Sequence, residues 1–167
     1  MNLYLMRHGI AAARSTGRRH RDADRPLTAQ GAEKVHRIAK ALKRRNVSFD
    51  VILSSPFRRA KETADIVASV FRCRDRIAPS LNLRVGGDPE AFVREMHSRY
   101  GRLRGILVVG HEPYLTSLIS VLLSGDTQMR ITMKKGGVCK LSVAHLRYGR
   151  CASLEWLIPP GKLLHGE

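Results

Sequence analysis

Three residues that could perform chemistry follow a short apolar run near the start of the chain. Residues 3–6 read Leu-Tyr-Leu-Met and are followed by Arg7, His8 and Gly9. Arginine offers a planar fork for phosphate or carboxylate, and histidine is a nucleophile or acid–base group at neutral pH. Gly9 allows a sharp turn and leaves space beside the imidazole. Our working hypothesis is that His8 attacks phosphorus. The alternative is a strand end that carries two polar residues without a chemical role.

The element that must position these residues is a buried strand. A short apolar run ended by glycine predicts a core strand that opens into a loop. In open α/β sheets, ligands bind at the carboxyl ends of the strands. Two further strands are predicted at 50–54 and 105–110; the first leads to Arg58 and Arg59, and the second ends at His111. Adjacent parallel strands would bring these ends to one edge.

The segments between the strands carry helix signals. Helix starts are predicted at Thr28, at Ser55-Pro56, at Asp88-Pro89 and at Glu112-Pro113. Residues 138–143 and 152–157 alternate as two closing strands, and Pro159-Pro160-Gly161 is predicted to end regular structure. We therefore expect one α/β domain over residues 1–167, a three-layer α/β/α sandwich around a mostly parallel, mixed sheet.

The charge of the chain is strongly positive. Thirty Lys and Arg against fourteen Asp and Glu give a net charge of +16, and the sequence pI is about 10.9. Such a surface attracts anions, nucleic acid included. The basic residues are scattered, however, and aromatic residues make up only 5% of the chain. Because few rings are available for base stacking, we do not expect a dedicated nucleic-acid-binding function.

Several classes of protein are not indicated. No apolar run approaches the roughly 20 residues that cross a bilayer, and no secretory signal is visible. We therefore expect a cytoplasmic protein without a membrane partner. Cys73, Cys139 and Cys151 are odd in number and lack CxxC spacing, so neither a disulfide framework nor a zinc site is predicted. We also expect a monomer.

The strand ends together have the composition of a phosphate pocket. Arg7, His8, His111 and one of Arg58 and Arg59 would converge without nearby carboxylates. Such a set is a poor metal site, because acidic ligands are missing and arginines repel a cation. Neither a GxxxxGK[ST] loop nor a GxGxxG turn after a strand is present, which argues against a nucleotide-binding enzyme.

Four motifs in this order resemble the signatures of the histidine phosphatase superfamily. They are residues 5–9 (Leu-Met-Arg-His-Gly), 27–31 (Leu-Thr-Ala-Gln-Gly), 55–64 (Ser-Pro-Phe-Arg-Arg-Ala-Lys-Glu-Thr-Ala) and 109–113 (Val-Gly-His-Glu-Pro). The small size, residues 25–28 (Arg-Pro-Leu-Thr) and residues 55–57 resemble the SixA-like phosphohistidine phosphatases in particular.

The resemblance implies a role for each motif residue. His8 would be the nucleophile, and Arg7, Arg59 and His111 would bind phosphate, with Gly9 also in the substrate-binding set. Arg59, which precedes an alanine, is the motif arginine, and Arg58 is left as a surface residue. Arg7 and Arg59 would each hold an oxygen pair by two parallel bonds, and a protonated His111 would neutralise a further charge. No cofactor and no metal are expected.

One departure from the family bears on the substrate. Many phosphomonoesterase and mutase-like members have a glutamate after the third strand that protonates the leaving oxygen, but residues 81–84 read Leu-Asn-Leu-Arg. Asp88 and Glu90 follow and are predicted to begin a helix, although either could swing in. A general acid typically raises the rate by about 10²–10⁴-fold. A phosphohistidine substrate depends less on such an acid, because imidazole leaves readily once its own nitrogen is protonated. Phosphohistidine on a protein is therefore favoured over small phosphorylated metabolites.

Two alternatives stay open, namely a phosphomonoesterase of small metabolites and an inactive protein that binds anions or nucleic acid. The loop from Ile10 to Pro26 is long enough to be functional, and the alternative for any one of its arginines is a solvated surface residue. These arginines are Arg14, Arg18, Arg19, Arg21 and Arg25. Residues 10–13 (Ile-Ala-Ala-Ala) suggest an open pocket. The remaining histidines are interpreted as surface residues: His20, His36, His97, His145 and His165.

Overall fold

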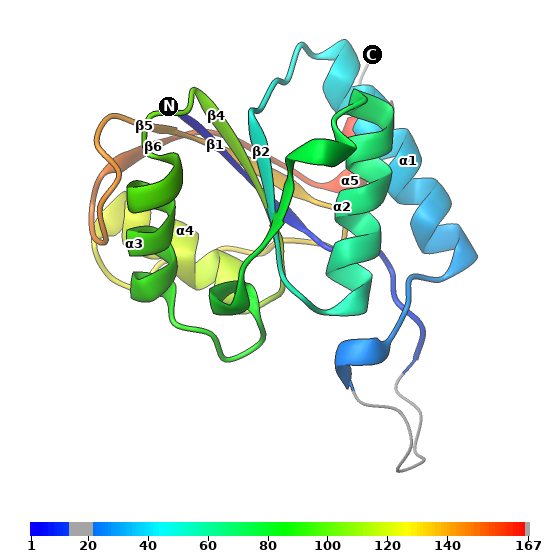
Figure 1. The fold of residues 1–167 in the computed structure, drawn as a ribbon, viewed down its shortest axis with the longest axis horizontal. Coiled ribbons are helices and arrows are strands. Elements are labelled where there is room, and N and C mark those ends of the chain that lie inside the picture. The colour runs from blue at the N-terminus through cyan, green and yellow to red at the C-terminus, as the bar shows by residue number, and fades with distance from the viewer. Residues whose placement is uncertain (14–21, 166–167) are drawn as a thin grey trace.

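The computed structural model describes residues 1–13 and 22–165. Six strands form one sheet in the order β3-β2-β4-β1-β5-β6 (Figure 1). The strands are β1 (Asn2–Arg7), β2 (Val51–Ser54), β3 (Ile77–Pro79), β4 (Gly105–Gly110), β5 (Val138–Val143) and β6 (Ala152–Ile158). β1, β2, β3 and β4 are mutually parallel, whereas β5 runs antiparallel to both β1 and β6. The sheet is therefore mixed and mostly parallel.

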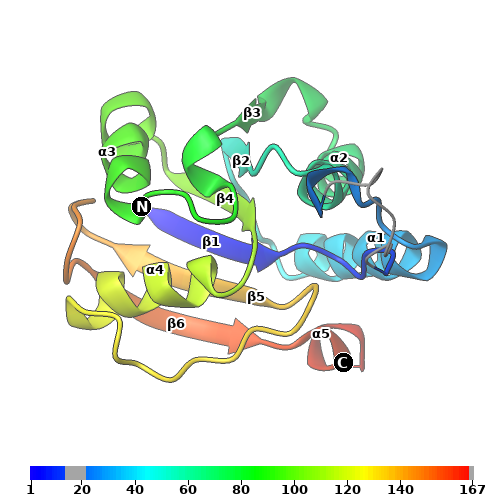
Figure 2. The same cartoon turned by 90° about the horizontal axis from the view of Figure 1, so that it is seen from below.

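Helices cover both faces of this sheet (Figures 1 and 2). They are α1 (Ala29–Arg44), α2 (Arg58–Phe71), α3 (Pro89–Tyr100), α4 (Tyr114–Ser124) and α5 (Pro160–His165). One core cluster joins α1, α2 and α5 to one face, and a second joins α3 and α4 to the other. The predicted three-layer α/β/α sandwich is confirmed. None of the helices in the described ranges is both long and apolar enough to cross a bilayer.

The two central strands are buried on both faces because helices pack on each side. Every residue of β4 is buried, and so are the four residues at the centre of β1. Their near-continuous apolar sequence is what parallel strands between two helical layers require. Arg7 pairs with Gly110 in the β1–β4 register, so the polar residues that follow the two strands emerge side by side.

The start of α2 differs from the sequence prediction, whereas the start of α1 agrees with it. α2 begins at Arg58 and not at Ser55-Pro56, and its N-cap Phe57 makes no side-chain capping bond. Ser55 stays extended because its N–H donates to Val109 O (3.0 Å), which continues the β2–β4 ladder beyond Ser54. Thr28 does cap α1, accepting from Gly31 N over 2.9 Å.

The end of the chain is also more regular than predicted. Pro159-Pro160-Gly161 does not end regular structure, because α5 begins at Pro160. Proline is well suited to the first position of a helix, where no intrahelical partner for an N–H is needed. Leu163 is buried against the α1–α2 side of the sheet, and burying it stabilises this short helix.

Candidate active site

The four polar residues singled out from the sequence meet at the carboxyl ends of β1, β2 and β4. Arg7 ends β1 and His8 follows it, Arg59 is the second residue of α2, and His111 follows β4. The His8 and His111 ring centroids lie 5.1 Å apart, and Arg59 Nε lies 3.2 Å from His8 Nε2. His8, Arg59 and His111 are all buried, with exposed fractions of 6%, 5% and 2%.

The His8 ring is held in one tautomer. Its Nδ1 lies 2.7 Å from Gly9 O, which can only accept, so Nδ1 carries the proton. Nε2 then presents its lone pair and accepts from Arg59 Nε. The pKa of His8 is lowered to about 4, mainly because the ring is buried. The hydrogen bond to the Gly9 carbonyl opposes this shift, and the positive charges of Arg59, Arg7 and Lys135 add to it. His8 is therefore a neutral imidazole with a nucleophilic Nε2 at pH 7.

Gly9 serves a different purpose from the one expected. Its backbone does not have a positive φ, so no sharp left-handed turn requires a glycine here. A Cβ at this position would lie 2.6 Å from Val35 Cγ2 and 3.2 Å from Leu27 Cδ2. The glycine is therefore needed because α1 packs directly against the loop. Its N–H donates to Thr63 Oγ1 over 3.1 Å.

Arg59 is anchored by a carboxylate that the sequence prediction missed. Its Nη1 donates to Asp22 O (2.7 Å) and its Nη2 to Asp22 Oδ2 (3.0 Å). Asp22 also pairs with Arg25 over 2.7 Å, and the hydrogen bonds and charges of the two arginines lower its pKa despite the opposing effect of burial. The expectation of a pocket without nearby carboxylates is thus wrong. The only signal for Asp22 in the sequence was its position in a long loop beside a strand end.

His111 is positioned by residues of the β2–α2 connection. Its Nε2 lies 2.7 Å from Ser55 Oγ, and its ring packs against that of Phe57, with 5.1 Å between centroids. Burial, with added repulsion from His8, Arg59 and Arg7, lowers the pKa of His111 to about 3. The ring is therefore neutral in this arrangement, and a bound phosphate anion would be needed to favour the protonated form.

Arg7 is held by a segment that precedes β5. Its Nη1 donates to Met133 O over 2.7 Å, and Gly136 N donates to Arg7 O over 3.0 Å. The same segment carries Lys135, an exposed lysine whose charge contributes to the lowered pKa of His8. The sequence offered no signal that separates Lys135 from the other scattered basic residues.

The other predicted residues lie in different settings. Arg58 is exposed and pairs with Glu62. Asp88 caps α3 by accepting from Glu90 N, and Glu90 pairs with Arg94 on the surface. Arg14, Arg18, Arg19 and Arg21 lie outside the described residues. Among the described residues, no group of three His, Cys, Asp or Glu side chains could hold a metal ion.

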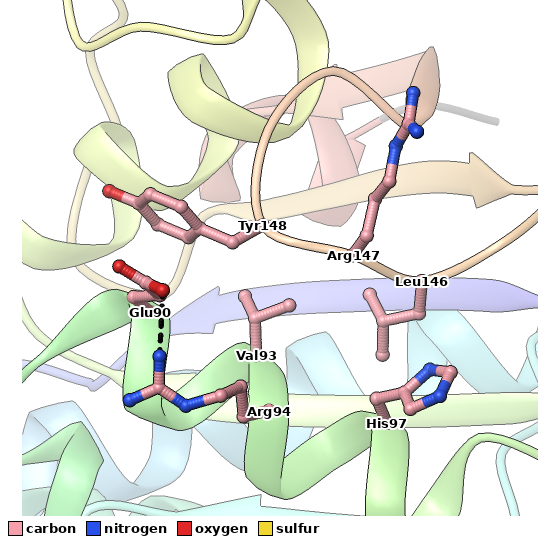
Figure 3. A pocket seen from close by; sticks show the side chains of 7 residues that line it. All are labelled: Glu90, Val93, Arg94, His97, Leu146, Arg147 and Tyr148. Carbon is pink, nitrogen blue, oxygen red and sulfur yellow. Dashed lines mark hydrogen bonds and ion pairs between the residues drawn. The ribbon is translucent and has the colours of Figure 1, made fainter.

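A separate surface pocket of about 430 Å³ lies between α3 and the β5–β6 connection (Figure 3). Its lining residues are Glu90, Val93, Arg94, His97, Leu146, Arg147 and Tyr148. Figure 3 shows Arg147 pointing away from the dashed Glu90–Arg94 ion pair, so the polar side chains do not converge on one point. This pocket includes none of the residues around His8.

Comparison with known proteins places this geometry in a family. The chain is 28% identical to the phosphohistidine phosphatase SixA of Escherichia coli K12 over 135 residues, which cover 79% of this chain and 80% of SixA. It is 39% identical to the adenosylcobalamin/alpha-ribazole phosphatase of the same organism over 90 residues, or 54% of this chain and 43% of that protein.

The fold is similar to that of a solved structure. The structure of the protein histidine phosphatase SixA complexed with tungstate matches with a TM-score of 0.82 at 24% identity, covering 98% of this chain and 99% of that one. The sequence profile of the histidine phosphatase superfamily (branch 1) matches residues 3–90, more than half of the chain. The chain therefore belongs to the histidine phosphatase superfamily.

Proposed function

We propose that this protein is a phosphatase that removes phosphate from phosphohistidine on a protein, through a covalent phosphohistidine intermediate on His8. The observation that carries this proposal is the arrangement around His8 Nε2. The Nδ1–Gly9 O hydrogen bond leaves the lone pair of the ring on Nε2, where it accepts from Arg59 Nε over 3.2 Å. A bound phosphate oxygen would take over the Arg59 donor and release this lone pair for attack on phosphorus. An activated nucleophile of this kind splits a difficult displacement into two easier steps.

Charge stabilisation supplies the rest of the proposed mechanism. In phosphoryl transfer the equatorial oxygens carry most of the negative charge, so fixed cationic donors dominate catalysis. Arg7 Nε is buried without a hydrogen-bond partner, so it is available to a phosphate oxygen. Both terminal nitrogens of Arg59 donate to Asp22. We therefore expect Arg59 to bind a phosphate oxygen through Nε and not through two parallel hydrogen bonds.

His111 would act on the same phosphate group. Its Nδ1 is buried without a hydrogen-bond partner, beside the ring of His8. A phosphate dianion placed between the two rings would raise the pKa of His111 and allow its proton to neutralise a further oxygen. In the second step, water attacks phosphorus, the P–Nε2 bond breaks, and inorganic phosphate leaves.

Two observations favour a phosphohistidine substrate. The sequence match to SixA extends over most of both chains, whereas the sequence match to the alpha-ribazole phosphatase covers less than half of that protein. The segment after β3 also offers no carboxylate free for acid catalysis, because Asp88 caps α3 and Glu90 is paired with Arg94. A phosphoimidazole leaves with its own nitrogen protonated and depends less on such an acid.

The test is to incubate the protein with a phosphohistidine-bearing protein labelled on phosphorus. We expect the label to pass to His8, where it is detected as an acid-labile phosphate on the peptide that contains this residue. The label should then appear as inorganic phosphate. The kcat/KM should exceed that for sugar phosphates and for p-nitrophenyl phosphate. Higher kcat/KM values for sugar phosphates would establish the metabolite phosphatase alternative instead. Salt-dependent nucleic-acid binding without any hydrolysis would support the inactive binding protein.

A further inference from the structure

Unpaired buried polar atoms gather at one corner of the site. Among the side chains that the structure describes, the buried nitrogen and oxygen atoms without a hydrogen-bond partner are Arg7 Nε, His111 Nδ1 and Glu112 Oε1. Arg7 faces Gly110 across the β1–β4 ladder, and His111 and Glu112 follow Gly110 directly. Buried polar groups are otherwise almost always paired, so a concentration of unpaired ones indicates a place where a ligand's polar atoms bind.

The Glu112 carboxyl is oriented by the first turn of α4. Thr116 Oγ1 lies 2.6 Å from Glu112 Oε2 and 3.0 Å from Pro113 O, so Oε1 is the carboxyl oxygen left without a partner. Burial raises the pKa of Glu112, although Thr116 and the positive charge of Arg7 oppose the shift. A carboxyl of this kind keeps its proton nearer to neutral pH than an exposed glutamate does.

The other carboxyls around the site are committed elsewhere. Asp22 binds Arg59 and Arg25, and its pKa is lowered, so it holds no proton at neutral pH. Asp88 caps α3, and Glu90 lies in an exposed ion pair with Arg94. Glu112 is therefore the carboxyl best suited to proton transfer among the described residues of this edge.

We propose that Glu112 is the proton donor to the leaving oxygen, and that the protein accordingly hydrolyses phosphate monoesters of alcohols as well as phosphohistidine. This inference rests on the proposed function, because it uses the same nucleophile. Glu112 comes from the loop after β4, and it would supply the acid that the segment after β3 lacks. Hydrolysis of phosphate monoesters would then depend on Glu112, which adjoins His111, and not on a glutamate in the segment after β3, where other family members carry one.

The proposed steps balance as follows. His8 Nε2 forms a bond to phosphorus while the ester P–O bond breaks, and the departing alkoxide takes the proton from Glu112 Oε1. The resulting Glu112 carboxylate accepts a proton from the attacking water, whose oxygen bonds to phosphorus as the P–Nε2 bond breaks. The electron pair returns to Nε2, inorganic phosphate leaves, and Glu112 is again protonated.

The experiment compares leaving groups in the Glu112→Gln variant. We expect kcat/KM for an alkyl phosphate such as glycerol phosphate, which reports the step in which the ester bond breaks, to fall by about 10²–10⁴-fold, because general acid help is lost. The kcat/KM for p-nitrophenyl phosphate, whose phenolate leaves readily without a proton, should fall by less than about tenfold. Equal losses for the two substrates would overturn the proposal, since a merely structural role affects both alike.

Two controls keep the result interpretable. Glu90→Gln removes a carboxylate of the same size from the exposed ion pair with Arg94 and should leave both rates unchanged. A titration with inorganic phosphate should give the same Kd for Glu112→Gln and for the unaltered protein, which shows that the pocket is intact.

A measurement on the unaltered protein avoids reliance on any variant. With an internal acid, kcat/KM across a series of phosphate monoesters should depend only weakly on the pKa of the leaving alcohol. A steep dependence, or turnover of phosphohistidine with no turnover of alkyl phosphates, would refute the role of Glu112 while the proposed function stands. Failure to label His8 with any substrate would instead refute the proposed function.

Discussion

Two regions of this molecule contain similar residue types and differ in burial. The edge at the ends of β1, β2 and β4 holds arginines, histidines and acidic residues, and so does the pocket beside α3 (Figure 3). At the first edge, His8 and His111 are buried and their pKa values are lowered to about 4 and 3. Beside α3, His97 and Arg147 are exposed, and Glu90 and Arg94 form an ion pair with both side chains more than half exposed.

The difference shows how burial changes the chemistry that is open to such residues. In water, an exposed ion pair contributes about 0–1 kcal/mol and its members keep many conformations. Inside the protein, each donor of the β1–β4 edge has a fixed direction, and electrostatic interactions are stronger because water is excluded. Each histidine and arginine at that edge can therefore be compared with a residue of the same type that lies on the surface.

The largest expected effect concerns the two histidines His8 and His97. His8→Ala should lower kcat by about 10⁴-fold or more, because the nucleophile is removed. Phosphate binding should survive in part, since Arg7 and Arg59 remain. The matched variant His97→Ala should keep full activity. Phosphate release by His8→Ala at the normal rate would remove His8 from the mechanism.

The next effect separates two adjacent arginines. Arg59→Lys keeps the positive charge but removes the Nε donor that faces His8, and we expect kcat/KM to fall by about 10²–10³-fold. Arg58→Lys, one position earlier and exposed, should change kcat/KM by less than about twofold. Steady-state kinetics with p-nitrophenyl phosphate measures both. A loss below about twofold in Arg59→Lys as well would show that a positive charge near the site is sufficient and that the direction of the Nε donor does not matter.

A smaller effect is expected for Asp22, which orients Arg59. Asp22→Ala removes the carboxylate bound to Arg59 Nη2, and the freed guanidinium should lower kcat/KM by about 10–100-fold through misplacement. The control is Asp24→Ala, an exposed aspartate in the same short 3-10 turn (Asp22–Asp24). Unchanged kinetics in Asp22→Ala would mean that Arg59 is oriented by its remaining contacts alone.

The smallest effect concerns stability against acid. The folded pKa values of His8 and His111 lie below the ordinary 6.5, so the unfolded chain binds more protons as the pH falls below 6.5. The contribution of the two neutral, buried imidazoles to the free energy of unfolding is therefore fully present above pH 6.5 and is lost as the pH falls toward about 4. Each imidazole should lower the free energy of unfolding by about 1.4 kcal/mol per pH unit in that window.

Denaturant titrations at several pH values measure this slope. His8→Asn should flatten it by the contribution of one imidazole, whereas His97→Asn, at an exposed position, should leave it unchanged. An identical pH dependence in His8→Asn and the unaltered protein would show that burial of His8 does not suppress its protonation.

Residue types and periodicity were sufficient for much of the architecture. The apolar runs around 3–6 and 105–110 predicted the buried parallel strands correctly, because a strand covered by helices on both faces has few polar positions. Thr28 and Asp88 were recognised as helix caps, since their side chains satisfy nearby N–H groups. The start of α2 was placed too early, because the pairing of Ser55 with β4 is a long-range contact that local signals do not contain.

Residue types and their spacing identify the candidates for phosphate chemistry and the strand ends on which they lie, because each motif is contiguous with its strand. Which atoms of these candidates are available depends on the tertiary structure. Asp22 engages the terminal nitrogens of Arg59, Met133 holds Arg7, and Glu112 Oε1 is left unpaired beside His111. These partners are far apart in the chain or depend on burial, and burial sets the protonation state of each group by withholding water from it.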